Sequence, residues 1–279
     1  MTPRGSYPSD LSDAHRELTE PTLTAWRAKR RRHALEIGRP PEHDLRHIMN
    51  AILYVDRTGI PWCYLPHDFT PWATVCGYFA KWDRDGIFVQ LTGLLRRLVR
   101  EAEGRDGEPS ACVPDSQSIK TSANVHLKDQ GTDAGKRIIR RKRHLGCDTL
   151  GLLLTVLVTA ASVSGTAAGV HLLSRTAAAR PGVRKAWVDA GYRTTAIDHG
   201  ARPGIDVQPV QRPPGTQGFV VIPRRWTIER SIGRLMHHRR LARDYETHPH
   251  RSEAMIHLAM IDLMTRRLTD EATPNWCCT

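Results

Sequence analysis

Three acidic residues that lie far apart in the chain have the chemistry of a divalent metal site. Asp115 and Asp189 each fall at the end of an expected strand, and Glu229 falls on an expected helix. Hard cations such as Mg²⁺ take oxygen ligands, usually a few carboxylates together with water and phosphate. Two metal ions about 3.5–4 Å apart can activate the attacking oxygen and stabilise the leaving oxygen of a phosphodiester. If the fold brings these three acids together, they could perform phosphodiester chemistry.

The segment that must position Glu229 spans residues 224–241, and its pattern predicts one amphipathic helix. Apolar residues recur there at spacings of four and three, so they share one face, and Glu229 falls at the rim of that face. Residues 224–243 hold seven arginines and Glu229 as their sole acid. Two interpretations of Glu229 are open: an ion pair with Arg225 one turn earlier, or a metal-binding carboxylate on a helix that also holds phosphates. The apolar residues of this face are Ile228, Ile232 and Leu235.

The two aspartates belong to a unit in which strands and helices follow one another. Pro114 argues for an edge position or an unusual local path of the strand that carries Asp115. The run 152–159 is continuously apolar, which predicts a buried central strand. The strands that end in Asp115 and Asp189 could be neighbours, with the helix of Glu229 packed over them. Strands are expected at residues 111–118, 143–149, 152–159, 184–189 and 205–210, and helices at 167–179 and, briefly, 194–199.

Each candidate acid also has a purely structural interpretation. Asp115 and Asp189 precede small residues and could cap turns. Asp148 is a rival acid, but it lies between two apolar strands and is followed by Thr-Leu-Gly, so we interpret it as a turn residue. His237 and His238 are interpreted as a solvated or DNA-facing patch, because adjacent helical residues point about 100° apart and cannot easily share a metal.

The first hundred residues predict a helical unit. Helical periodicity begins at residue 45 and stops at Gly59, and it returns near residues 75–82 and 87–99. Several short helices with turns between them fit a helix-turn-helix-like DNA-binding bundle. The segment 26–33, WRAKRRRH, has five basic residues and is either a solvated face or loop, or a phosphate-contacting arm. The aromatic residues expected in the core of this unit are Trp62, Trp72, Phe79 and Trp82.

Composition points to a polyanionic partner. The chain has 279 residues, a formal charge of +12 and an isoelectric point near 9.9, which is typical of proteins that bind nucleic acid. It lacks an apolar run of 18 residues and an apolar N-terminal signal region, so we expect a cytoplasmic, nucleoid-associated protein without a membrane partner. The six cysteines lack zinc-ligand spacing and are expected to be reduced thiols. A Gly-rich phosphate loop is missing, so ATP use is unsupported.

Several short motifs follow one another along the chain. In the first hundred residues they are LPHDF at 65–69 and WDRDG at 82–86. Further along, they are DSQSIKT at 115–121, KRHLGCDTLG at 142–151, WVDAGYR at 187–193, GFVVIPRRWTIER at 218–230 and RRLARDYE at 239–246. Together, in this order, they resemble the DDE transposases of small bacterial insertion sequences. The resemblance runs from about Leu11 to Leu268 and is specific because the motifs occur together.

The resemblance implies an α/β fold, a ribonuclease H-like mixed sheet flanked by helices, preceded by the helix-turn-helix-like domain. It implies a catalytic triad of Asp115, Asp189 and Glu229, which would bind Mg²⁺ or Mn²⁺. The implied reaction is cleavage at the ends of the element and joining of the freed 3′-hydroxyl to target DNA. We expect residues 1–100 to be the DNA-binding domain, 101–110 a linker, 111–268 the catalytic domain and 269–279 a tail.

The partners implied are double-stranded DNA, as element ends and target, and a second copy of the chain in a homodimer on DNA. Arg225 and Glu229 match a signature of the family, whereas Ile222 and Met236 stand where it has tyrosine and lysine. Residues 163–166 lack an aspartate common in relatives, and Thr194 replaces a common glycine. Two alternatives stay open: an inactive copy that still binds DNA, and a metal-dependent nuclease without strand transfer. Expected DNA contacts are Lys120, Lys142, Arg143, Arg193, Arg225, Arg230, Arg239 and Arg240.

Overall fold

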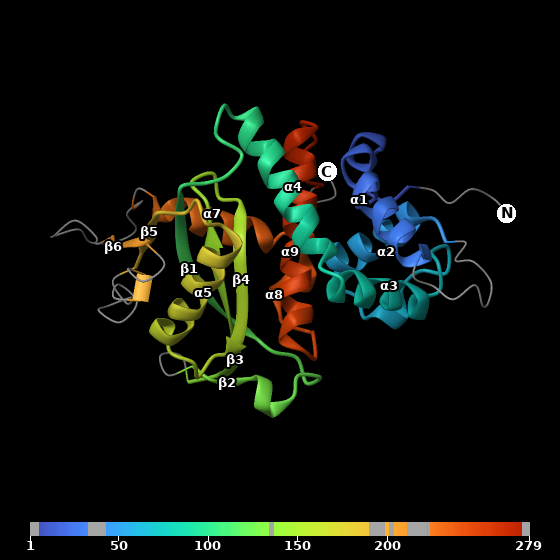
Figure 1. Ribbon diagram of the computed structural model, residues 1–279. Coiled ribbons are helices and arrows are strands. Elements are labelled where there is room, and N and C mark those ends of the chain that lie inside the picture. Colours follow the sequence, from blue (N-terminus) through green and yellow to red (C-terminus); the bar gives the residue numbers. More distant parts are fainter. Residues whose placement is uncertain are drawn as a thin grey trace.

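The structure is a computed structural model that describes residues 6–32, 43–133, 137–189, 199–200, 204–210, 222 and 224–274. A helical part and a part built on a mixed sheet lie side by side (Figure 1). Two long helices, α4 and α9, stand between the sheet and the remaining N-terminal helices (Figure 1). Within the described residues, no helix is both long and apolar enough to cross a bilayer.

The helical part contains the helices expected from periodicity. The second of its helices ends at Gly59, whose φ of 75° suits glycine and whose N–H donates 2.9 Å to the Val55 carbonyl. The basic residues 27–32 form the last turns of the first helix, so they are helical rather than a loop. The elements are α1 (Asp13–Arg32), α2 (Leu45–Thr58), the 3₁₀ turn η1 (Trp62–Tyr64), α3 (Trp72–Arg84) and α4 (Ile87–Ala102).

Aromatic side chains fill the interior of this part, as predicted for most of them. Phe79 and Trp82 are buried, and Trp62 is partly buried against them. The prediction is wrong for Trp72, which is 47% exposed. Trp72 is the first residue of α3, directly after Pro71, and the apolar face of that helix starts only at Val75.

The sheet has six strands in the described part of the chain. The order is β2-β3-β1-β5-β6, with β4 also paired to β3. β1 is antiparallel to β3 and parallel to β5, and β5 is parallel to β6. The strands are β1 (Ala111–Lys120), β2 (Gly131–Thr132), β3 (Ile139–Cys147), β4 (Leu153–Ala160), β5 (Lys185–Val188) and β6 (Asp206–Pro209). The other elements are η2 (Leu127–Asp129), α5 (Gly165–Ala179), α7 (Arg225–Leu235), α8 (Arg239–Ala242) and α9 (Pro249–Leu268).

The apolar run 152–159 forms β4, but the prediction that it is a central strand is wrong. Within the described residues, β4 pairs only with β3. Both α5 and α9 pack against β4, on opposite sides (Figure 1). A strand covered on both faces requires apolar side chains on both faces, so its composition reflects burial by helices rather than a central place in the ladder.

The C-terminal helix α9 completes the helical part as well as the sheet part. It packs most extensively against α4, and also against β4 and α2. Most of its side chains are buried, including Met255, Ile256 and Leu258. One continuous apolar core therefore runs from α2–α4 through α9 to the face of the sheet that carries Val113.

Candidate active site

The local path of β1 explains how Asp115 is positioned. β1 pairs with β5 only at Ala111 and Cys112, whereas its ladder with β3 runs from Val113 to Lys120. The parallel ladder ends just before Pro114, which has no N–H to donate. β1 is an inner strand of the sheet, but at Pro114 it pairs with β3 alone, as a residue in an edge strand does. Asp115 is the next residue and lies beyond the point at which β1 and β5 stop pairing. The prediction that it ends its strand is wrong, because the ladder with β3 carries β1 on to Lys120.

Alternation along the strands places Asp115 and Asp189 on one face of the sheet. Val113 packs in the core shared with α7 and α9, whereas Cys112 packs on the other face, under α5. Because side chains alternate, Asp115 shares the face of Val113. In β5, Trp187 packs on that same core, so Asp189, two residues later, shares the face too.

Glu229 reaches this face from α7, which packs on β1. The buried residues Ile228 and Leu235 attach α7 to the shared core, and the Ser231 hydroxyl donates 2.7 Å to the Gly151 carbonyl. Glu229 follows Ile228 and is partly buried, with 35% of its side chain exposed. The predicted rim position of Glu229 matches this placement, with its carboxylate between the core and the surface.

Arg225 links two of the three acids. Its Nη2 atom donates 3.3 Å to Oδ2 of Asp115 and lies 3.9 Å from Oε1 of Glu229. Arg225 thus forms the ion pair with Glu229 that was one interpretation of this acid, and it also forms an ion pair with Asp115. Arg225 and Asp115 are mostly buried, at 18% and 15% exposed. A single guanidinium therefore lies between the first and third members of the expected triad.

Burial dominates the electrostatics of Asp115 and raises the pKa of its carboxyl group above the ordinary value. The Ser116 N–H, which donates 2.7 Å to Oδ1, and the Arg225 guanidinium oppose this shift. The negative charge of Asp189 raises the same pKa further. Asp115 and Asp189 thus repel each other across the site, which favours the binding of a cation between them.

The donor types fit a hard divalent cation, because three carboxylates share one face of the sheet. Among the described residues, however, no three His, Cys, Asp or Glu side chains approach one another as closely as metal ligands do. The Arg225 guanidinium lies in the space between Asp115 and Glu229. The chemistry of Asp115, Asp189 and Glu229 therefore suits Mg²⁺ or Mn²⁺, with Arg225 as the cation that this structure holds there.

The predicted single helix over residues 224–241 is wrong in one respect. α7 ends at Leu235, and a turn separates it from α8. His238, in that turn, is buried rather than solvated or DNA-facing. Its Nδ1 lies 2.6 Å from Asp56 in α2, and its Nε2 lies 3.6 Å from Asp262 in α9. Two carboxylates from distant helices therefore draw this histidine inward, while His237 stays exposed.

Three of the expected DNA contacts lie where a phosphate could reach them. Lys120 is exposed at the end of β1, Arg230 is exposed on α7 and Arg239 is exposed at the start of α8. Arg225, at the first turn of α7, is mostly buried and pairs with Asp115 and Glu229. Arg193 lies outside the described residues.

The other three basic residues are held by the protein itself. Arg143 is buried and donates 2.6 Å from Nη1 to the Leu241 carbonyl. Arg240 is buried and donates 2.8 Å from Nε to Glu246. Lys142 is half-buried and donates 3.4 Å to the Val163 carbonyl. The structure therefore gives Arg143 and Arg240 a packing role in place of the predicted DNA contact.

The rival acid Asp148 is a turn residue, as predicted. Its Oδ1 accepts hydrogen bonds of 2.9 Å from the N–H groups of Leu150 and Leu152 in the β3–β4 turn.

The structure also describes the two residues that depart from the family signature. Ile222 is buried, and the Met236 sulfur accepts a 3.7 Å contact from the Gln117 amide.

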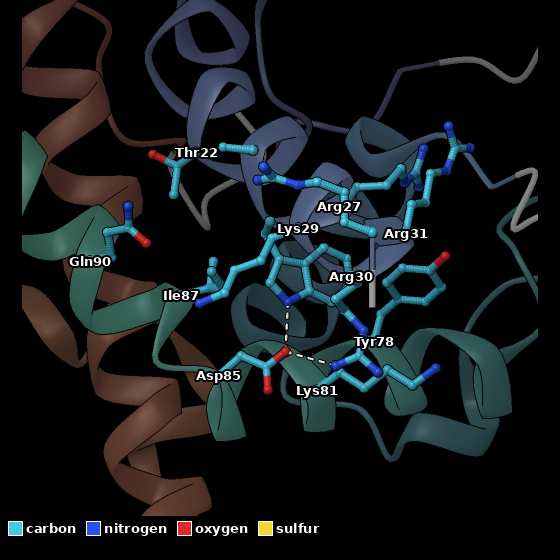
Figure 2. Close-up of a pocket in the computed structure, with 13 residues that line it drawn as sticks. Thr22, Arg27, Lys29, Arg30, Arg31, Tyr78, Lys81, Asp85, Ile87 and Gln90 are labelled. Carbon is cyan, nitrogen blue, oxygen red and sulfur yellow. Dashed lines mark hydrogen bonds and ion pairs between the residues drawn. The ribbon is translucent and has the colours of Figure 1, made fainter. Parts of the chain in front are cut away.

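A basic pocket of about 880 Å³ opens between α1, α3 and the start of α4 (Figure 2). Its one acid, Asp85, accepts hydrogen bonds of 2.7 Å from the Trp26 indole and 2.9 Å from Arg30 (Figure 2). Sequence reasoning singled out the run at 26–33 but not the pocket, which needs α3 and α4. Its six cationic side chains are Arg27, Lys29, Arg30, Arg31, Arg32 and Lys81.

Comparison with known families agrees with this geometry. The family described as "Putative transposase of IS4/5 family" matches residues 11–92, and the family described as "Transposase DDE domain" matches residues 106–263. The second match covers more than half of the chain, so the protein belongs to the DDE transposase family of insertion sequences. Its mixed sheet flanked by helices is the ribonuclease H-like core of that family. Searches of curated proteins and of solved structures give no match.

Proposed function

We propose that this transposase cleaves DNA at the ends of an insertion sequence and joins the freed 3′-hydroxyl to target DNA. The observation that carries the proposal is the shared position of Asp115, Asp189 and Glu229 on one face of the sheet, two of them around a single cation. Membership of the DDE transposase family supports it independently. The expected division, with residues 1–100 binding DNA and 111–268 performing catalysis, forms part of this proposal.

Asp115, Asp189 and Glu229 would hold the divalent metal. When bound, Mg²⁺ or Mn²⁺ supplies activation of the attacking oxygen and stabilisation of the leaving oxygen of a phosphodiester. The sheet fixes the two aspartates, because strands covered by packed helices allow little movement. Glu229 stands on a helix attached to the core by Ile228, so the backbone that carries its carboxylate is fixed too.

Exposed cations would hold the DNA backbone. Lys120, Arg230 and Arg239 reach the surface from three different elements, and Arg225 lies at the start of α7. A second basic surface, the pocket between α1 and α3, would contact phosphates of the element end. Because two ends must be joined in one event, we expect two copies of the chain on the DNA.

The test is joining of a precut duplex end, which carries a free 3′-hydroxyl, to a target plasmid. The wild-type chain is expected to give joined products with Mg²⁺ and none with a chelator. Glu229→Gln is expected to bind the duplex normally and to give no joined product. Glu20→Gln, the same chemical change at a half-buried position of α1 where Glu20 pairs with Arg16, is the matched control and is expected to retain joining.

Two other results would overturn the proposal in different ways. DNA binding without cleavage or joining by the wild-type chain identifies an inactive copy that only binds DNA. Cleavage of end-containing DNA with Mg²⁺, but without joining of precut ends, identifies a nuclease that uses water as its only nucleophile.

A further inference from the structure

The contacts of Arg225 are unusual for a residue that only stabilises a helix. Its guanidinium bridges Asp115 of β1 and Glu229 of its own helix, at 3.3 and 3.9 Å. An ordinary pair of residues four apart on a helix would contact Glu229 alone. In this structure the longer contact is the one within the helix, and the shorter one reaches across to the sheet.

The surroundings of Arg225 leave it able to move. It is the first residue of α7, where the helix begins beside the sheet. Its Nε is buried and has no hydrogen-bond partner within the described residues, and both of its ion-pair contacts are made by Nη2. The neighbouring Arg224 packs on the Trp187 ring, 4.5 Å from its centroid, and anchors the chain where α7 begins.

We propose that Arg225 is the resident counter-cation of the metal site: it occupies the carboxylates of Asp115 and Glu229 until a DNA phosphate draws it away. The inference rests on the proposed function, because it assigns the carboxylates to a divalent metal. Its consequence is that metal loading and DNA binding are coupled through one side chain.

Electrostatics predicts that DNA binding strengthens metal binding at this site. A guanidinium and a divalent cation compete for the same carboxylate oxygens and repel each other, so the metal binds less tightly while Arg225 remains in place. A phosphate oxygen is an equally good partner for a guanidinium, which can hydrogen-bond it in a bidentate manner. A bound DNA backbone therefore releases Asp115 and Glu229 to the metal. Without DNA, the site keeps its arginine and binds metal weakly.

The experiment measures Mn²⁺ binding to the full chain by electron paramagnetic resonance of free Mn²⁺, with and without a saturating duplex. The variants are Arg225→Gln, which removes the positive charge, and Arg225→Lys, which keeps the charge but lacks the planar guanidinium that can bridge two carboxylates. Arg234→Gln removes one charge from an exposed position of the same helix and is the matched control. Circular dichroism checks that each variant folds, and fluorescence anisotropy checks that the duplex is saturating.

Without DNA, Arg225→Gln is expected to bind Mn²⁺ about tenfold more tightly than the wild type, with Arg225→Lys between them. Adding the duplex is expected to tighten Mn²⁺ binding to the wild type and to Arg234→Gln by a similar factor, and to change Arg225→Gln little. Equal Mn²⁺ affinity in the wild type and Arg225→Gln, or an equal response of both to DNA, would overturn the inference.

Asp115→Asn and Glu229→Gln separate this inference from the proposed function. If both abolish Mn²⁺ binding while Arg225→Gln leaves it unchanged, the metal site stands and only the role of Arg225 is wrong. If the wild type binds no Mn²⁺ even with saturating DNA, the metal-dependent function and the role of Arg225 are both overturned.

Discussion

Nη1 of Arg100 in α4 lies 2.7 Å from Oδ2 of Asp148 in the β3–β4 turn, and both side chains are buried. The other oxygen of Asp148 accepts two backbone N–H groups of that turn. One carboxylate thus shapes the turn and ties the helical part to the sheet. Because α4 also packs along α9, this ion pair helps to hold the sheet beside the helices that cover it.

Breaking that ion pair is expected to destabilise the whole chain. Arg100→Met leaves Asp148 charged and buried, which costs about 3–5 kcal/mol of unfolding free energy. Arg97→Gln, at an exposed position on the same helix, is the control and is expected to cost less than about 1 kcal/mol. Urea denaturation followed by circular dichroism measures both. Equal midpoints for the two variants would show that the pair contributes little.

The buried contact of His238 predicts a pH-dependent stability. Burial disfavours the imidazolium, but the Asp56 carboxylate at 2.6 Å, with Asp262 on the other side, outweighs it and raises the pKa of His238 above 6.5. The folded state therefore holds the proton more tightly than the unfolded state. This stabilisation is complete below about pH 6.5 and is lost as the pH rises through the folded-state pKa.

His238→Gln is accordingly expected to lower stability most at pH 6, by about 3 kcal/mol, and progressively less at higher pH. The measurement is thermal or urea unfolding at several pH values between 6 and 9. His237→Gln, at the exposed neighbouring position, should show a small effect without this trend. A loss at His238→Gln that is constant over the whole range would contradict the account.

The basic pocket predicts a specific salt dependence of DNA binding. Lys29→Gln combined with Arg31→Gln removes two cations that line the pocket. If both contact phosphates, the slope of log K against log salt should become shallower by about 0.9 for each. Fluorescence anisotropy titrations of a labelled end duplex at several salt concentrations measure the slope. Arg16→Gln, in α1 but outside the pocket, should leave it unchanged; an equal change there would show only a general charge effect.

Local pattern predicted most of the elements, because hydrophobic periodicity and turn residues act over a few neighbours. The segments that became β1, β4 and α5 were each placed within a few residues of their observed limits. Pro114 indicated a position with a strand partner on one side, and β1 pairs there with β3 alone. The neighbourhood of Asp115, Asp189 and Glu229 on one face was expected from the order of strands and the family resemblance together.

The errors came from partners distant in sequence. The helix break before His238 was missed because apolar spacing continues through it, while Asp56 and Asp262, which hold the histidine, come from other helices. Arg143 and Arg240 looked like surface cations, but backbone carbonyls and Glu246 bind them inside the protein. The bridge of Arg225 to Asp115 likewise depends on the tertiary packing of α7 on β1, which no local pattern encodes.

The central claim, that Asp115, Asp189 and Glu229 act as one catalytic unit, is tested most directly by cleavage rates of single and double variants. Asp115→Asn, Asp189→Asn and Glu229→Gln are each expected to reduce Mg²⁺-dependent cleavage of end-containing DNA by at least about 10³-fold, with DNA binding retained. Combining Asp115→Asn with Glu229→Gln should cause little further loss, because residues that act as a unit are not additive. Wild-type cleavage by any single variant, or losses that multiply in the double variant, would contradict the account.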